Sequence, residues 1–191
     1  MSAMYKGVIT ALLLSTGTLA AAAPVHQHGL AQAAVVLEGT TLTVSFQAPL
    51  MDVLGTERPP ADAASRTRYR DRLQQLTAPV PAPAATCQLS EAARTTVDVL
   101  FPVSAAEHDH DHDHDHDHDH DHDHDHDHDD HGHQDVEAQW VFQCDTPAAL
   151  TGVTLPFLAT FNSLTTEVVT LLPSGQGAVR LQPGDTRIPL E

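Results

Sequence analysis

Histidine and aspartate alternate along one stretch of the chain, and these residue types bind metal. The alternation covers residues 108–129, and Asp-His-Gly-His at 130–133 closes it. A neutral imidazole is a ligand for ions such as Zn²⁺, which accept three or four such groups. Thirteen imidazoles would therefore serve about three or four zinc ions. The candidate ligands in this run are His108, His110, His112, His114, His116, His118, His120, His122, His124, His126, His128, His131 and His133.

Neither a strand nor a helix suits this run without metal. In a strand all the aspartates would share one face. In a helix like residues would face each other at i,i+4, and Asp is a poor helix former. We therefore expect a solvated, disordered loop. Because each bound ion must order several residues at about 1–2 kcal/mol each, we expect several sites of moderate affinity rather than one tight site.

The run alone does not name its metal, since imidazole suits nickel, copper and zinc alike. Another interpretation is an unselected repeat expansion that forms an acidic spacer. That interpretation gives no reason for Gly132 and His133, or for the separate pair His26 and His28. This pair either forms a second metal-binding point or is simply solvated.

The formal net charge of −17 is concentrated in the same run. Residues 107–133 contain Glu107 and twelve aspartates with no Lys or Arg, so they supply −13 and leave only −4 for the rest. A nearly balanced body without a basic patch for phosphates argues against nucleic-acid binding.

The N-terminus has the pattern of a secretory signal. Lys6 precedes an apolar stretch at 8–19 and an alanine-rich A-x-A site at 20–23, too short together to span a membrane. Cleavage after Ala22 is favoured. No cysteine follows for a lipid anchor, and no later stretch could cross a membrane, so we expect an exported, soluble protein.

Cys87 and Cys144 are expected to pair in an oxidising compartment. The bridge would contribute about 4 kcal/mol in the chain-entropy model. Its loop contains the whole run, so we expect it to tie the base of the run to the folded body. The alternative is that both thiolates join a zinc site, although no C-x-x-C pair is present.

The rest of the chain predicts a mainly β protein with a few helices, an α+β fold built from antiparallel hairpins. Alternating apolar residues predict a hairpin of strands 30–37 and 41–47, followed by a turn at 49–55. Asp62 can cap a helix that ends near residue 76. Its inner residues would be Tyr69, Leu73 and Leu76, and its outer residues Arg66, Arg70 and Arg72. These arginines suggest either a binding face or an ordinary solvated surface.

The run is predicted to join two strands, at 95–101 and 136–144, as the oversized loop of a hairpin. Phe157 and Phe161 have helical spacing within 155–164 and are expected in the core. Strands at 165–172, 176–181 and 187–190 complete the chain. We divide it into a signal peptide (1–22), a β-rich half with one helix (23–103), the metal-binding loop (104–134) and a second β-rich half (135–191), two halves that could be similar.

Several of these features together resemble the ZrgA-like family of His-rich periplasmic proteins tied to zinc acquisition. They are the His-Gln-His-Gly motif at 26–29, the Pro-to-Gly turn at 49–55, the His-rich insertion, Trp-Val-Phe-Gln-Cys at 140–144 and the aromatic segment at 157–161. The resemblance implies a β-rich body, zinc binding through the His-rich region, and a role beside a zinc importer in the Gram-negative envelope. The family usually has Gly-Phe-Glu-His after the turn, whereas this chain has Arg58 in place of that histidine. We therefore expect zinc binding mainly through residues 108–133.

The leading hypothesis is therefore a periplasmic protein that buffers, scavenges or hands on zinc, with a periplasmic zinc-importer binding protein as its possible partner. Sequestration of excess nickel or copper and a passive envelope interaction module are the alternatives. We do not expect an enzyme. A catalytic zinc site needs three fixed ligands and a general base, and no hydrolase motif or phosphate loop occurs.

Overall fold

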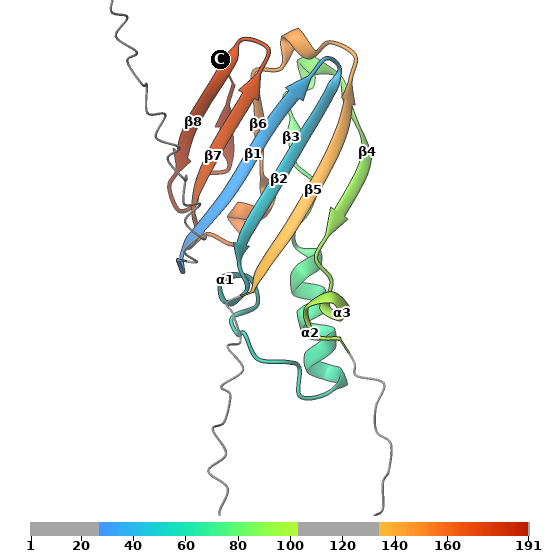
Figure 1. Ribbon diagram of the computed structural model, residues 1–191, viewed down its shortest axis with the longest axis vertical. Coiled ribbons are helices and arrows are strands. Elements are labelled where there is room, and N and C mark those ends of the chain that lie inside the picture. Colours follow the sequence, from blue (N-terminus) through green and yellow to red (C-terminus); the bar gives the residue numbers. More distant parts are fainter. Residues whose placement is uncertain (1–26, 103–133, 191) are drawn as a thin grey trace, which may run out of the picture.

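The computed structural model describes residues 27–102 and 134–190. The predicted signal peptide, His26 and the run at 104–133 lie outside this range. The protein is mainly β, as predicted, with a six-stranded sheet in the order β4-β5-β2-β1-β7-β8 and a three-stranded sheet in the order β3-β6-β9. The smaller sheet lies behind the larger one, and three helices gather at one end (Figure 1).

The strands are β1 (Leu30–Glu38), β2 (Thr41–Pro49), β3 (Val80–Pro81), β4 (Cys87–Arg94), β5 (Asp135–Cys144), β6 (Gly152–Thr154), β7 (Thr165–Leu172), β8 (Gly175–Leu181) and β9 (Arg187–Pro189). The helices are α1 (Leu50–Leu54), α2 (Ala63–Gln74) and α3 (Val97–Leu100). Short 3₁₀ turns occur at Pro83–Ala85, Pro147–Ala149 and Pro156–Ala159.

The β1–β2 hairpin follows from its sequence alternation. Residues 31, 33, 35 and 37 of β1 and 42, 44, 46 and 48 of β2 are buried, and the residues between them are more exposed. Gly39 adopts a positive φ of 60° in the tight turn between the strands, a conformation that costs glycine little. Pro49 ends β2, and α1 begins at the next residue.

Strands from the two predicted halves lie side by side in one sheet. β1 pairs in parallel with β7, and β2 pairs antiparallel with β5. The buried apolar residues of both halves form one cluster. The segments 23–103 and 135–191 therefore share a sheet and a core, while the signal-peptide and loop boundaries stay predictions.

Aromatic side chains fill the centre of that core. Phe157 packs edge-on against Phe46 with ring centroids 4.8 Å apart, and it stacks on Trp140 at 5.6 Å. Phe157 and Phe161 are both buried, as expected. Their segment is not an extended helix, however: the chain forms a 3₁₀ turn at Pro156–Ala159. Pro156 favours such a short turn, because its fixed φ suits the first helical position.

β4 and β5 are antiparallel neighbours, and the chain between them contains α3 and the run, so a hairpin with an oversized connection is present, but its first strand is β4 and not 95–101. The strand predicted at 95–101 is wrong. β4 ends at Arg94, and α3 follows. The Thr96 side chain accepts a hydrogen bond from the Val99 N–H at 3.4 Å and caps this short helix. Val97 and Leu100 are buried, and their spacing of three fits a helix as well as the apolar run fits a strand.

The predicted disulfide between Cys87 and Cys144 is present, but the expectation that it ties the base of the run to the body is wrong. Cys87 begins β4 and Cys144 ends β5, and the two residues are register partners. The run leaves the hairpin at its other end, after Arg94 and before Asp135. At about 3.4 Å per residue, the length of β5 places the bridge about 30 Å from the base of the run.

One buried hydroxyl offers a test of the core. Thr166 is fully buried in β7, and its Oγ1 has no hydrogen-bond partner within the described part of the chain. An unpaired buried polar group is costly, so Thr166→Val should raise the free energy of unfolding by about 1 kcal/mol, or at least leave it unchanged. Chemical denaturation measures this. The matched control is Val168→Thr, which buries a new hydroxyl on the same face of β7 and should cost about 1–3 kcal/mol. A loss of stability in Thr166→Val would contradict the prediction.

Candidate functional site

The residues that flank the run, up to Pro102 before it and from Gln134 after it, are its two bases. Both bases are fixed at the end of the large sheet where the helices lie. At the second base, after the run, the Gln134 carbonyl accepts a hydrogen bond of 2.8 Å from the Leu50 N–H at the start of α1. At the first base, before the run, the Phe101 carbonyl accepts a hydrogen bond of 3.0 Å from the Arg66 side chain of α2. Contacts with α1 and α2 thus fix the positions of the residues on either side of 103–133.

Helix α2 is held in place by a capping box at its start. The Asp62 side chain accepts a hydrogen bond of 2.6 Å from the Ser65 N–H, and Ser65 Oγ accepts one of 3.0 Å from the Asp62 N–H. The hydrogen bond from the Ser65 N–H is the main reason that the pKa of Asp62 lies below its ordinary value, with smaller contributions from the Ser65 hydroxyl and from Arg68. The prediction that Asp62 caps this helix is confirmed.

A cavity of about 550 Å³ lies between the two bases. Its lining consists of Glu57, Arg58 and Pro59 from the linker after α1, Leu100 to Pro102 at the first base and Gln134 at the second. Tyr69 of α2 contacts the Phe101 ring at 6.0 Å between centroids, and its hydroxyl donates to the Arg58 carbonyl at 3.4 Å. The linker after α1, helix α2 and the first base of the run therefore form one packed unit.

The first described residues also approach this end. The Gly29 N–H donates to Asp52 Oδ2 of α1 at 2.8 Å, and His28 Nδ1 lies 3.9 Å from the same oxygen. Asp52 was not among the predicted site residues. The Pro-to-Gly turn predicted a helical turn and its end at Gly55, but no local pattern indicates that its carboxylate meets a residue 23 positions earlier.

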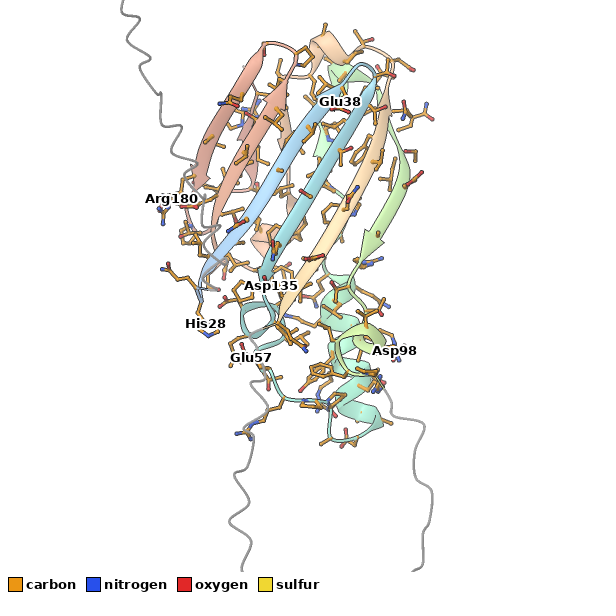
Figure 2. The ribbon with its side chains drawn as sticks, in the orientation of Figure 1. His28, Glu38, Glu57, Asp98, Asp135 and Arg180 are labelled. Atoms are coloured by element: carbon orange, nitrogen blue, oxygen red, sulfur yellow. A yellow bond between two sulfur atoms is a disulfide. The ribbon has the colours of Figure 1, made fainter. Side chains whose placement is uncertain are left out.

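Carboxylates and one imidazole therefore gather at the helical end. His28, Glu57, Asp98 and Asp135 lie there, whereas Glu38 lies at the opposite end of the sheet (Figure 2). They do not form a metal cage: within residues 27–102 and 134–190, no group of three or more His, Cys, Asp or Glu side chains could hold a metal ion. Cys87 and Cys144 are joined to each other, so they offer no thiolates.

Of the predicted metal ligands, the structure places only His28, whose side chain is about half exposed. His26 and the thirteen histidines of the run lie outside the described residues. At the position where the resemblance would place a further histidine, Arg58 is exposed on the rim of the cavity between the bases. The described residues thus form the folded domain to which both ends of the run are attached.

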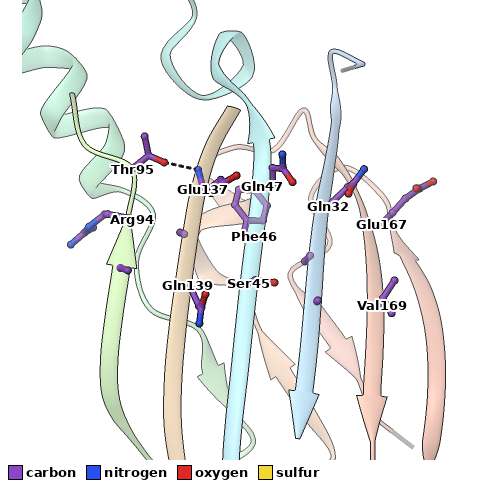
Figure 3. A pocket seen from close by; sticks show the side chains of 14 residues that line it. Gln32, Ser45, Phe46, Gln47, Arg94, Thr95, Glu137, Gln139, Glu167 and Val169 are labelled. Carbon is purple, nitrogen blue, oxygen red and sulfur yellow. Dashed lines mark hydrogen bonds between the residues drawn. The ribbon is translucent and has the colours of Figure 1, made fainter. Parts of the chain in front are cut away.

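A second hollow, of about 600 Å³, lies on the face of the large sheet that does not bury the core. Gln32, Gln47 and Gln139 project from neighbouring strands there, with Glu137 and Glu167 beside them (Figure 3). Thr95 accepts a hydrogen bond of 2.9 Å from the Glu137 N–H at its edge. Besides these amides and carboxylates its lining contains Arg94, Ser45 and Thr95 but no His or Cys, so these residues offer zinc neither imidazole nor thiolate.

The fold and this attachment define a class: a two-sheet β domain with a His-rich segment inserted between two adjacent antiparallel strands, both bases of which rest on helices. A family model described as ZrgA family zinc uptake protein matches residues 25–190. The chain therefore belongs to this family, and its role is related to zinc uptake. A search of curated proteins gave no match. Within the described ranges, no helix is long and apolar enough to cross a bilayer.

Proposed function

We propose that this protein binds Zn²⁺ in the periplasm and buffers it, scavenges it or hands it on in support of zinc uptake. The observation that carries the proposal is the concentration of thirteen of fifteen histidines in a single acidic run. Membership of a zinc uptake family supports it. His26 and His28 are candidates for an additional binding point.

The chemistry of the run suits capture and transfer more than storage in one tight site. Neighbouring aspartates can accept the second imidazole N–H and orient the ring, or add oxygen ligands. Their combined negative charge attracts cations from a distance. Because many near-equivalent imidazoles lie along one chain, an ion can exchange ligands stepwise and move to a recipient. We propose a periplasmic zinc-importer binding protein as that recipient, and no catalytic role.

Replacing the thirteen histidines from His108 to His133 with asparagine tests the proposal. Isothermal titration of the mature protein with Zn²⁺ should give about three or four ions per chain. The variant keeps the length and the carboxylates of the run, and it should bind at most one ion, through His26 and His28. Deletion of residues 108–133 should give the same result. Equal stoichiometry in the intact protein and both variants would overturn the proposal.

Expression and growth experiments separate zinc uptake from sequestration of nickel or copper. A zinc uptake role predicts higher expression under zinc starvation and poorer growth of a deletion strain with a chelator, restored by added zinc. A sequestration role predicts higher expression under nickel or copper excess. Affinity alone does not separate them, since imidazole binds Cu²⁺ more tightly than Zn²⁺.

A further inference from the structure

The arginines of this chain cluster at the helical end. Six of its eight arginines lie between residues 58 and 94, and four of them are on α2. Residues four apart on a helix lie on the same side. Arg66 and Arg70 therefore share one flank of α2, and Arg68 and Arg72 share the other. We call these pairs the two arginine flanks.

Each arginine flank lies beside one base of the run. Arg66 donates to the Phe101 carbonyl and pairs with Asp98 of α3, so the first flank adjoins the point where the run begins. On the second flank, Arg72 donates to the Val53 carbonyl of α1 at 2.9 Å, and Gln134 is bound to the start of the same helix. Arg72 also stacks on the Phe161 ring at 4.5 Å.

The remaining guanidinium groups are available to a ligand. Arg68 and Arg70 are exposed, and their side chains make no hydrogen bond or ion pair with the residues that the structure describes, although the charge of Arg68 also acts on Asp62. Arg58, at the rim of the cavity between the bases, is exposed as well. Three exposed cations near both ends of a segment that carries −13 are an electrostatic match.

The few residues between each base and the nearest carboxylates of the run limit how far those carboxylates can lie from the base. Glu107 is five residues beyond Pro102, and Asp130 is four residues before Gln134. At no more than about 3.6 Å per residue, the first carboxylate lies within about 18 Å of Pro102, and Asp130 lies within about 15 Å of Gln134. The twelve residues of α2 span about 18 Å. By chain length alone, the acidic segments next to both bases can therefore reach α2.

We propose that the two arginine flanks of α2, with Arg58, bind the acidic run of the same chain, residues 107–130, through its carboxylates when metal is absent. The contact itself is independent of zinc binding. Its consequence for zinc rests on the function proposed above: each bound Zn²⁺ adds two positive charges to the run and orders its side chains, so docking on α2 and zinc binding oppose each other. The arginine flanks therefore lower zinc affinity and favour release.

The contact is tested on the metal-free mature protein by nitrogen-15 NMR. The comparison is between the intact chain and a variant with the twelve aspartates from Asp109 to Asp130 changed to asparagine and every histidine kept. At low ionic strength, we expect different shifts for the α2 amides and the Arg68 and Arg70 side chains. The differences should vanish near 0.5 M salt, where screening is effective within about 4–5 Å. The Arg180 side chain, on β8 at the far edge of the sheet, should not change. Coincident α2 signals at low salt would overturn the proposal and leave the zinc function standing.

A second test measures the opposition to zinc. The double variant Arg68→Gln with Arg70→Gln should bind Zn²⁺ about two- to ten-fold more tightly at low salt with unchanged stoichiometry, because each exposed ion pair changes an equilibrium by up to about five-fold. Arg180→Gln is the matched control, since Arg180 is exposed and pairs with Glu167 at 3.4 Å. It should leave zinc affinity unchanged. Equal gains in both variants would mean a general charge effect and would overturn the proposal.

Discussion

Lowering the pH from 7 to 5 is expected to weaken each three-imidazole zinc site by about four orders of magnitude. Only the neutral imidazole binds metal, and its ordinary pKa is about 6.5. At pH 7 most imidazoles are neutral, whereas at pH 5 about 3% are, which costs about 25-fold per ligand. Three ligands multiply this factor, so binding is strong above the pKa and is lost as the pH falls through it. Equilibrium dialysis with metal analysis at pH 7, 6 and 5 measures the release.

The variant with asparagine in place of the thirteen histidines serves as the control. A free Asp side chain is mostly ionised at pH 5, so any weak binding through the carboxylates of this variant should change little over this range. If the intact protein kept its zinc at pH 5, carboxylates rather than imidazoles would hold the ion. The acidic run would then bind metal as an oxygen-ligand segment, and the number of histidines would not set the stoichiometry.

Strands with one wet and one buried face were predictable from this sequence. Val136, Ala138, Trp140, Phe142 and Cys144 are all buried on one side of β5, as their alternation requires. The segment at 95–101 was not predictable in the same way. Its apolar residues suit a strand or a short helix, and the deciding contact is the Thr96 cap, a weak local signal. Short apolar segments are ambiguous for this reason.

Long-range placement limited the prediction of the site. The presence of the run was evident from composition, but its attachment depends on pairing between residues far apart in the chain. The parallel pairing of β1 with β7 and the hydrogen bond from Leu50 to Gln134 leave no periodic trace in the sequence. The disulfide shows the same limit. Its existence followed from having two cysteines in a chain that we predict to be exported, whereas its position depended on where β4 begins, and Cys87 opens that strand.

Replacing Cys87 and Cys144 with alanine is expected to lower the free energy of unfolding by about 3–4 kcal/mol, because the bridge spans 57 residues. The bridge holds β4, a strand at the edge of the large sheet. All its residues after Cys87 are exposed, so it buries little apolar surface of its own. In addition, 40 residues separate β4 from β5. Closing such a loop costs about 2 kcal/mol more than closing a four-residue hairpin. The bridge offsets this cost at the opposite end of the strand pair.

Chemical denaturation and zinc titration on the same alanine variant separate the two interpretations of the cysteines. Stability should fall while zinc stoichiometry stays unchanged, because the bridge lies about 30 Å from the base of the run. The control is the same double substitution in the protein that lacks residues 108–133. There, the loss of stability should be smaller by about 0.5 kcal/mol, because the cross-linked loop is shorter. Loss of one zinc ion per chain in the alanine variant would instead assign the thiolates to a metal site and contradict the structural role of the bridge.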